Sequence, residues 1–224
     1  MNFALEKMKA EPFSIIGHRG SSMAEQNSLE AIEIAIKSGA DLIEVDAIKD
    51  NEGNLVLSHD KIKKGKTKVI DLLNFALDKV GIIIDLKDNS VDELVEIIKE
   101  LGAGKWVVVS SLNFNVLKRL KKVNPSIQVG LSYYYPIISR VGNREEVNPV
   151  RDAIASNFEV IFPFVGVLKK RDIDIAKGNK VLVSTWVVNN IAIAMGAVYL
   201  GVNGIITDYP NKLRELKEKV SLNL

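Results

Sequence analysis

The stretch NSLEAIEIAIKSGADLIEVDA, residues 27–47, joins two hydrophobic patterns that differ in period. In its first part, apolar residues recur at helical spacing from Leu29 to Ile36. Gly39 follows them, in the position where glycine often ends a helix. The second part, DLIEVDA (41–47), is a short apolar run typical of a strand buried on both faces. The stretch therefore predicts a helix that leads directly into a buried strand.

The same alternation continues in both directions along the chain. Eight strand-like runs are each followed by a helix-like segment or by a loop that can hold one, which gives 28 residues per unit in a chain of 224. This predicts a closed (β/α)8 barrel, the TIM-barrel fold, as a single domain over residues 1–224, with only a very short insertion between Asp60 and Asp85. An open doubly wound sheet is the rival, but no G-x-G-x-x-G follows the first run and the chain has no Walker A sequence. The eight runs are FSII (13–16), DLIEVDA (41–47), GIIIDL (81–86), WVVVS (106–110), SIQVGL (126–131), EVIFPFV (159–165), KVLVSTW (180–186) and VNGIIT (202–207).

Signals for helix ends accompany the helical segments. In SVDELVEIIKELG (90–102), Ser90 stands three residues before Glu93, which is the spacing of a capping box. We therefore expect the Ser90 side chain to cap a helix that stops at Gly102. The segments 189–201 and 209–220 show a similar pattern.

Composition excludes several classes of function. The chain has no cysteine, which removes disulfides, thiolate zinc sites and cysteine nucleophiles, and which is compatible with a reducing cytoplasm. A net charge of +2 is too small to indicate a nucleic-acid partner or an acidic membrane surface. No apolar run approaches the ~20 residues that span a bilayer, and the first residues lack the apolar core of a signal peptide. We expect a cytoplasmic protein with no stable membrane insertion that acts on a small molecule.

Acidic residues fall at the ends of the predicted strands, where barrels of this type carry their chemistry. Glu44 and Asp46 are two residues apart, so both point to the same face of a strand, and Asp85 and Lys87 have the same relation on the next one. Three carboxylates at one barrel mouth repel each other unless a proton or a cation lies between them. Oxygen ligands alone favour a hard cation such as Mg2+ or Ca2+. The alternative is that they are ordinary interior residues paired with Arg19 and Lys87.

Both histidines of the chain, His18 and His59, also follow strand-like runs. Because the ordinary pKa of histidine lies near neutrality, a pair of imidazoles suits the transfer of protons to and from oxygen. Arg19 and Lys87 add positive charge beside the carboxylates, which suits an anionic substrate, most plausibly a phosphate.

Two further patterns are less specific. The lysines at 61, 63, 64, 66 and 68 follow His59 and either steer an anionic substrate or, as we favour, form a solvated loop. The tyrosines Tyr133, Tyr134 and Tyr135 either line a pocket or pack a long loop.

The segment GHRGSSMAEQNSLEAIEIAIKSGADLIEVDAIKDNEGNLVLSHD (17–60) resembles the opening of the glycerophosphodiester phosphodiesterase family. That family shows His-Arg-Gly, Glu-Asn-Thr, Gly-Ala-Asp with Glu-x-Asp, and His-Asp, in the same order and at the same spacing. Similar motifs continue as DLK (85–87), STWVVNN (184–190) and GVNGIITDYP (201–210).

The resemblance implies a TIM barrel that hydrolyses glycerophosphodiesters to an alcohol and glycerol phosphate with one divalent cation, Mg2+ or Ca2+, with Mn2+ as a further candidate. In that family the nucleophile can be the glycerol hydroxyl of the substrate, which gives a cyclic phosphate before water attacks. The roles that the resemblance implies are acid and base for His18 and His59, metal ligands for Glu44, Asp46 and Asp85, phosphate binding for Arg19 and Lys87, and pocket lining for Trp186.

This chain departs from the family pattern at three places. Asp85 stands where the family favours Glu, and Gln26 and Ser28 stand in place of the Glu and Thr of Glu-Asn-Thr. Only 24 residues separate Asp60 from Asp85, where the family commonly carries a larger insertion. The shorter segment predicts a more open mouth and a wider or different preference among diesters.

Two other functions compete with this prediction. A phospholipase C- or D-like barrel acting on intact lipid would carry exposed apolar or aromatic residues near the mouth, and the tyrosines at 133–135 are the hint of these in the sequence. A catalytically silent barrel would bind a phosphate ligand or a partner protein without turnover. Both histidines are present, which favours an enzyme.

Overall fold

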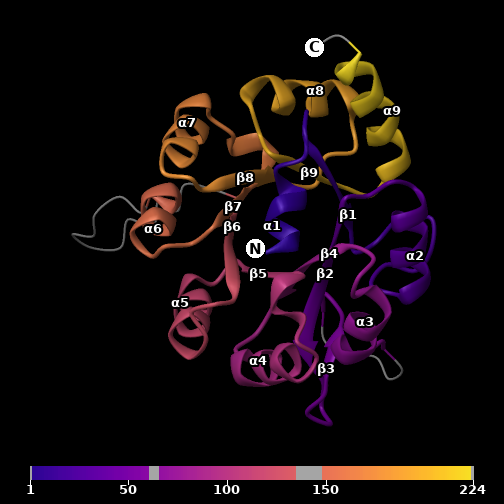
Figure 1. Ribbon diagram of the computed structural model, residues 1–224, viewed down its shortest axis with the longest axis vertical. Helices are drawn as coiled ribbons and strands as arrows, with labels where there is room; N and C mark the ends of the chain where they lie inside the picture. The colour runs from indigo at the N-terminus through magenta and orange to yellow at the C-terminus, as the bar shows by residue number, and fades with distance from the viewer. Residues whose placement is uncertain (1, 61–65, 135–147, 223–224) are drawn as a thin grey trace.

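A computed structural model describes residues 2–60, 66–134 and 148–222. Eight parallel strands form a ring in which each strand pairs with the next, and β1 pairs with both β9 and β2 to close it (Figure 1). The predicted (β/α)8 barrel is confirmed, and each strand begins and ends within two residues of its predicted run. The barrel strands are β1 (Ser14–His18), β2 (Leu42–Lys49), β4 (Gly81–Leu86), β5 (Val107–Ser111), β6 (Gln128–Tyr133), β7 (Val160–Pro163), β8 (Leu182–Thr185) and β9 (Gly204–Thr207).

A short additional strand, β3 (Leu55–Leu57), lies outside the barrel and pairs antiparallel with the end of β2. The turn between them is held by Asp50, whose Oδ1 accepts hydrogen bonds from the backbone amides of Glu52 and Asn54. The chain then returns to the barrel, where the amide of Ser58 donates to the carbonyl of Asp46 at 3.1 Å. This hairpin carries the next residue, His59, to the carboxyl end of β2.

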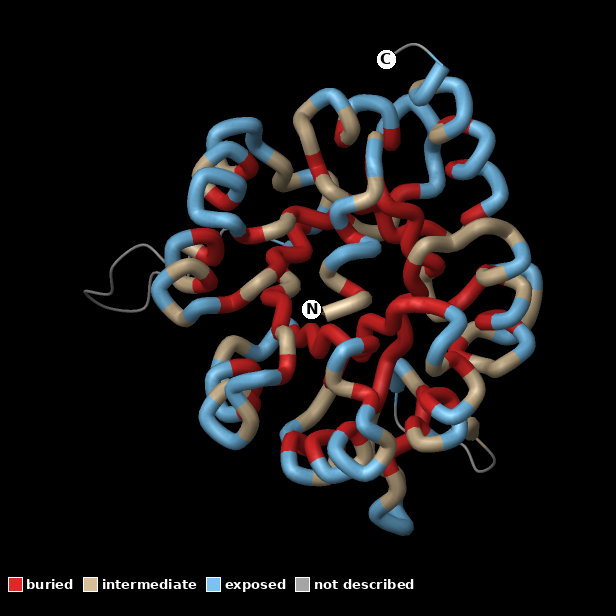
Figure 2. Tube along the Cα trace, viewed as in Figure 1, coloured by how far each residue is buried: buried red, intermediate tan, exposed pale blue. Residues whose placement is uncertain are grey.

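Helices surround the barrel and bury their apolar stripes against the outer face of the sheet (Figures 1 and 2). Burying a side chain of this kind contributes ~1.5–3 kcal/mol. In α4 the buried stripe consists of Val91, Leu94, Val95 and Ile98. Within the described part of the chain, no helix has the length and apolar character needed to cross a bilayer. The outer elements are α2 (Leu29–Lys37), α3 (Val69–Ala76), α4 (Val91–Glu100), η1 (Ala103–Lys105), α5 (Phe114–Val123), α6 (Pro149–Ala155), η2 (Val165–Val167), α7 (Lys170–Gly178), α8 (Ile191–Leu200) and α9 (Pro210–Ser221).

The first helix, α1 (Phe3–Met8), lies across the amino-terminal end of the barrel (Figure 1). Ala4 and Met8 are fully buried and pack with Ile16, Leu42 and other inward-facing residues of the barrel. Because α1 covers this end, the interior of the barrel is accessible from the opposite end, at which the strands terminate.

The predicted capping box at the start of α4 is wrong. Ser90 is the residue before the helix, but its side chain makes no capping hydrogen bond. Glu93 forms an ion pair with Lys49, which comes from the end of β2. The Asp88 carboxylate accepts hydrogen bonds from the amides of both Ser90 and Lys49. Tertiary contacts therefore tie the start of α4 to the end of β2, and the Ser90 side chain does not cap the helix.

Candidate active site

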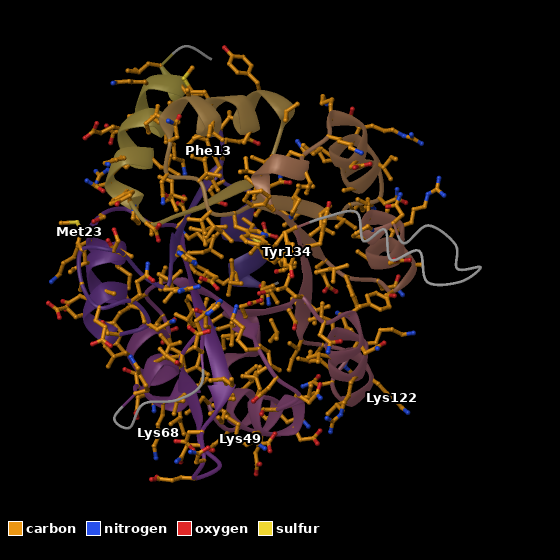
Figure 3. The ribbon with its side chains drawn as sticks, turned by 180° about the vertical axis from the view of Figure 1, so that it is seen from behind. Phe13, Met23, Lys49, Lys68, Lys122 and Tyr134 are labelled. Atoms are coloured by element: carbon orange, nitrogen blue, oxygen red, sulfur yellow. The ribbon has the colours of Figure 1, made fainter. Side chains whose placement is uncertain are left out.

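The carboxyl ends of the strands surround a cavity of about 430 Å3. Figure 3 views the barrel from this end, with Tyr134 near the middle of the ring. Every residue that the sequence singled out for the site lines this cavity: His18, Arg19, Glu44, Asp46, His59, Asp85, Lys87 and Trp186.

Strand register brings three acidic residues together. Parallel pairing places His18 beside Glu44 between β1 and β2, and Asp46 beside Asp85 between β2 and β4. The three carboxylates have oxygens within 4.8 Å of one another, and all three residues are buried. We call Glu44, Asp46 and Asp85 the acidic trio. Such a set of anionic oxygen atoms can bind a hard divalent cation.

Two basic side chains contact the acidic trio directly. Arg19 Nε lies 2.7 Å from Asp46 Oδ2, and Lys87 Nζ lies 2.6 Å from Asp46 Oδ1 and also contacts Asp85. The Arg19 Nε–H is buried and has no well-directed acceptor, so this contact is a close charge pair rather than an aligned hydrogen bond. The pairing of interior carboxylates with Arg19 and Lys87, which the sequence left open, is present in the structure.

The ionisation of the trio follows from these contacts. Burial raises the pKa of Glu44 well above its ordinary value, and the nearby charges of Asp46 and Asp85 raise it further. Burial also opposes ionisation of Asp46, but Lys87 and Arg19, together with a hydrogen bond from Asn27, hold its pKa below the usual value. Burial disfavours the charged form of Lys87, yet Asp85 and Asp46 outweigh it and raise the lysine pKa.

The turn after β1 explains the two glycines of GHRG. Arg19 has φ of 51°, and its amide donates to Glu44 Oε2 at 3.1 Å. Gly20 has φ of 88°, and a Cβ there would lie 2.6 Å from the backbone of Ala31. A Cβ on Gly17 would lie 2.4 Å from the Gly20 carbonyl oxygen. A left-handed conformation costs ~1–2 kcal/mol for a residue other than glycine, so this turn keeps Arg19 in a strained position against the trio.

His18 is fixed by Asp208, a residue that the sequence analysis did not assign to the site. His18 Nδ1 lies 2.8 Å from Asp208 Oδ1, and this hydrogen bond lowers the pKa of the Asp208 carboxyl against the opposing effect of partial burial. Asn189 donates to Asp208 Oδ2 at 2.6 Å and accepts from the Asp208 amide. Asp208 directly follows the predicted strand run 202–207. The other site residues were selected because they are polar residues at strand ends, and the same criterion would also have selected Asp208.

The contacts of Gln26 give a physical reason for one departure from the family pattern, the replacement of Glu by Gln. Its Nε2 donates to Asp208 Oδ1 at 3.2 Å, and its Oε1 accepts from Arg19 at 3.4 Å. An amide can bridge a carboxylate and a guanidinium in this way, whereas an ionised Glu would repel Asp208. Ser28, the other substituted residue, caps α2 by accepting a hydrogen bond from the amide of Ala31.

His59 lines the cavity with 47% of its side chain exposed. Its Nδ1 is 2.9 Å from Asp60 Oδ1, and the Asp60 side chain is 90% exposed. Of the lysines that follow, Lys66 pairs with Glu25 at 2.6 Å, while residues 61, 63 and 64 lie outside the described residues.

The opposite side of the cavity is apolar. Trp186 is held by a 2.6 Å hydrogen bond from its Nε1 to the carbonyl of Phe162. Tyr134 packs edge-on against the indole with ring centroids 6.3 Å apart, and Phe164 packs at 5.6 Å. Tyr134 therefore lines the pocket, whereas Tyr133 is buried in the core, which raises its pKa, and Tyr135 lies outside the described residues.

Comparison with known proteins agrees with this geometry. The Glycerophosphoryl diester phosphodiesterase family matches residues 18–81 and 66–212, which together span most of the chain. A glycerophosphodiester phosphodiesterase of Caldanaerobacter subterraneus subsp. tengcongensis is 26% identical over 92% of this chain and 98% of its own length. A crystal structure of a glycerophosphodiester phosphodiesterase from Parabacteroides distasonis shares the fold with a TM-score of 0.80 at 20% identity, covering 93% of this chain and 98% of its own. An Oleispira antarctica phosphodiesterase, solved with the product sn-glycerol-3-phosphate, has a TM-score of 0.76 at 17% identity, covering 90% of this chain and 95% of its own. The chain belongs to the glycerophosphoryl diester phosphodiesterase family and, with it, to the phosphoric diester hydrolases.

Proposed function

We propose that this protein hydrolyses glycerophosphodiesters to an alcohol and glycerol phosphate, with His18 and His59 as the acid–base pair and with one divalent cation. The observation that carries the proposal is that one cavity is lined by both histidines, three carboxylates, an arginine and a lysine. The names of the Caldanaerobacter relative and of the Oleispira product complex support the same reaction.

The acidic trio fits a hard cation by its chemistry. Its ligand atoms are all carboxylate oxygens, they converge within 4.8 Å, and they are buried. We therefore propose that Glu44, Asp46 and Asp85 hold Mg2+ or Ca2+, with Mn2+ as a further candidate. The bound cation would stabilise negative charge on the phosphoryl oxygens.

We assign phosphate binding to Arg19 and Lys87. Both lie within 3 Å of Asp46 and both line the cavity, so their charges are already at the position where an anionic group would bind. The left-handed turn at Arg19 keeps the guanidinium there without the flexibility of an open loop. A guanidinium fork and an ammonium group can bind two nonbridging oxygens of one diester.

The two imidazoles are oriented alike. Each has its Nδ1 beside a carboxylate, Asp208 for His18 and Asp60 for His59, which leaves Nε2 as the nitrogen available to substrate. One imidazole accepts the proton of the attacking hydroxyl, and the other donates a proton to the departing alkoxide. Asp208 acts as a positioning residue, because it contacts His18 and not the reacting atoms.

The test is hydrolysis of glycerophosphodiesters by metal-stripped protein, with Mg2+, Ca2+ or Mn2+ added back. Activity should return with metal and should be lost in His18→Ala and in His59→Ala. Lys122→Ala, on the exposed outer surface of α5, is the control and should retain full activity (Figure 3). Binding of a diester without turnover under every metal would instead support the catalytically silent barrel.

A cytoplasmic location and a wider choice of diesters stay predictions. The latter follows from the short segment between Asp60 and Asp85. A single strong preference for glycerophosphocholine among diesters of equal size would contradict it.

A further inference from the structure

Each carboxylate of the acidic trio is held through one of its oxygens by an uncharged hydrogen-bond donor. Glu44 and Asp46 receive these hydrogen bonds from the turn that follows β1. Asp85 receives its hydrogen bond from the other direction, because Ser110 Oγ, on β5, donates to Asp85 Oδ1 at 2.7 Å. Ser110 also lines the cavity, so this hydrogen bond lies inside the candidate site.

Strand register places the Ser110 hydroxyl beside the Asp85 carboxylate. The two residues are partners between β4 and β5, in the same layer of the barrel in which Asp46 is the partner of Asp85. Since partners in register point to the same face of a sheet, Ser110 faces the interior of the barrel. The next partner along this layer is Gly130 of β6, where a Cβ would lie 2.2 Å from the ring of Phe162. The polar row of this layer therefore ends at Ser110.

The hydrogen bond from Ser110 leaves the other oxygen of Asp85 directed toward the rest of the trio. Asp85 Oδ2 contacts Lys87 Nζ, and the same ammonium group lies 2.6 Å from Asp46 Oδ1. These two carboxylate oxygens therefore converge, whereas Asp85 Oδ1 is taken by the hydroxyl. Ser110 is 2% exposed and Asp85 7%, so water has little access to the bond between them. A donor on one oxygen restrains rotation of the carboxylate and so selects the oxygen that faces the cavity.

The simpler explanation is that a buried hydroxyl needs an acceptor, whatever that acceptor is. The neighbouring Ser111 shows this simpler case, because it is equally buried and donates to the backbone carbonyl of Leu86 at 2.8 Å. Ser110 differs because its acceptor is a charged side chain of the trio. A hydrogen bond to a charged group is stronger than one between neutral groups. The chain therefore contains two adjacent serines with the same burial and different acceptors.

We propose that Ser110 is a positioning residue for the divalent cation, because its hydroxyl holds the Asp85 carboxylate with Oδ2 toward the other two acidic residues. The inference rests on the proposed function, since it takes the acidic trio as the cation site. Ser110 acts through Asp85 and does not itself bind the cation or the phosphate. Groups that orient metal ligands in this way contribute about 10- to 100-fold to metal affinity. Because the other two carboxylates keep their own donors, we expect Ser110→Ala to raise the cation Kd about tenfold, at the lower end of that range.

The experiment measures the Kd of metal-stripped protein for Mg2+, Ca2+ and Mn2+ by isothermal titration calorimetry, in the absence of substrate. Ser110→Ala should weaken binding of the tightest cation about tenfold. Ser111→Ala is the matched control and should stay within twofold of wild type. Ser110→Thr retains the hydroxyl and should bind the cation within threefold of wild type. Thermal melting of the metal-free variants checks that each folds, and the two alanine variants should lose similar stability, because each loses a buried hydrogen bond.

A double-mutant cycle separates positioning from direct binding of the cation. In an Asp85→Ala background, Ser110→Ala should change the Kd less than twofold, because the hydroxyl then has no carboxylate to orient. Electron paramagnetic resonance of Mn2+ measures the weaker binding in this background. A tenfold effect that persists there would show that Ser110 binds the cation itself and would overturn the proposal. Equal Kd values for Ser110→Ala and wild type, or equal losses in Ser110→Ala and Ser111→Ala, would also overturn it.

Failure of the proposed function gives a different pattern from failure of this inference. In that case no diester is hydrolysed with any cation, while the titrations still report whether Ser110 affects cation binding. Wild-type protein that binds none of the three cations would overturn this inference together with the proposed metal site.

Discussion

The contact between His18 and Asp208 allows a sharp test of how the site is organised. Asp208→Asn keeps the size of the side chain and removes its negative charge. The imidazole Nδ1 is 2.8 Å from the Asp208 carboxylate, and Asn189 and Gln26 hold that carboxylate in place. We expect the substitution to leave His18 in the cavity but to weaken the hydrogen bond that orients its imidazole.

The expected loss of kcat can be estimated from the hydrogen bond between Asp208 and His18. A hydrogen bond to a charged group contributes ~1.5–3 kcal/mol net. The Asp208 side chain is 19% exposed, so partial screening by water favours the lower part of that range, ~1.5–2 kcal/mol. If the transition state loses all of this stabilisation in the variant, kcat falls about 10- to 30-fold. Because Asp208 does not contact substrate, KM should change less than twofold.

The chain contains its own control for this experiment. Asp60 makes the same contact with His59 at 2.9 Å, but its side chain is 90% exposed. Since exposed ion pairs contribute little, Asp60→Asn should lower kcat less than threefold. Steady-state kinetics on one glycerophosphodiester separates kcat from KM in both variants. An Asp208→Asn enzyme within threefold of wild type, or equal losses in the two variants, would refute the positioning role.

Three further predictions concern the metal, the turn and pH. If the proposed metal site is correct, chelation should abolish activity. Asp85→Asn should then raise the Mg2+ or Ca2+ concentration for half-maximal activity at least tenfold in a titration of stripped enzyme, because one of the three proposed carboxylate ligands is removed. Gly20→Ala should lower the free energy of unfolding in urea by ~2 kcal/mol or more, whereas Gly102→Ala, also at positive φ but with no neighbouring atom within 4 Å, should cost only ~1 kcal/mol. The pKa of Asp208 is lower in the folded protein than in the unfolded chain, where it lies near ~3.9, so the ionised carboxylate stabilises the fold. This stabilisation should be fully present above the unfolded pKa and should be lost as the pH falls through the folded pKa. The difference in melting temperature between wild type and Asp208→Asn should therefore shrink between pH 5 and pH 2, and a constant difference would contradict this linkage.

The barrel was predictable because its signals are local. Runs of valine, isoleucine and leucine mark strands buried on both faces, and the two-residue spacing of Glu44 and Asp46 places both carboxylates on one face whatever surrounds them. Parallel strands that end at one rim then bring His18, Glu44 and Asp85 together without any knowledge of the detailed packing.

What could not be predicted depends on contacts between distant parts of the chain. Asp208 stands at a predicted strand end, but its hydrogen bond to His18, 190 residues away, depends on the pairing of β9 with β1 when the barrel closes. The capping-box prediction at Ser90 failed: the Ser90 side chain makes no capping hydrogen bond, and the Glu93 side chain pairs with Lys49 from another strand. The role of α1 as the closure of the barrel also had no local signal, since a short amphipathic helix does not reveal what it packs against.

When all three carboxylates of the acidic trio are ionised, the charges of the trio, Arg19 and Lys87 balance only if a divalent cation and an anionic substrate are both present. The ionised acidic trio carries three negative charges, whereas Arg19 and Lys87 supply two positive charges, so one negative charge is in excess. The raised pKa of Glu44 reflects this excess, because burial and its acidic neighbours favour a proton there. A divalent cation would reverse the balance to one positive charge, which is the charge that a phosphodiester monoanion neutralises. Under the proposed function, a bound cation would share the neutralisation of the trio with Arg19 and Lys87, and the positive charge of these two side chains would then be available to a phosphate beside the cation.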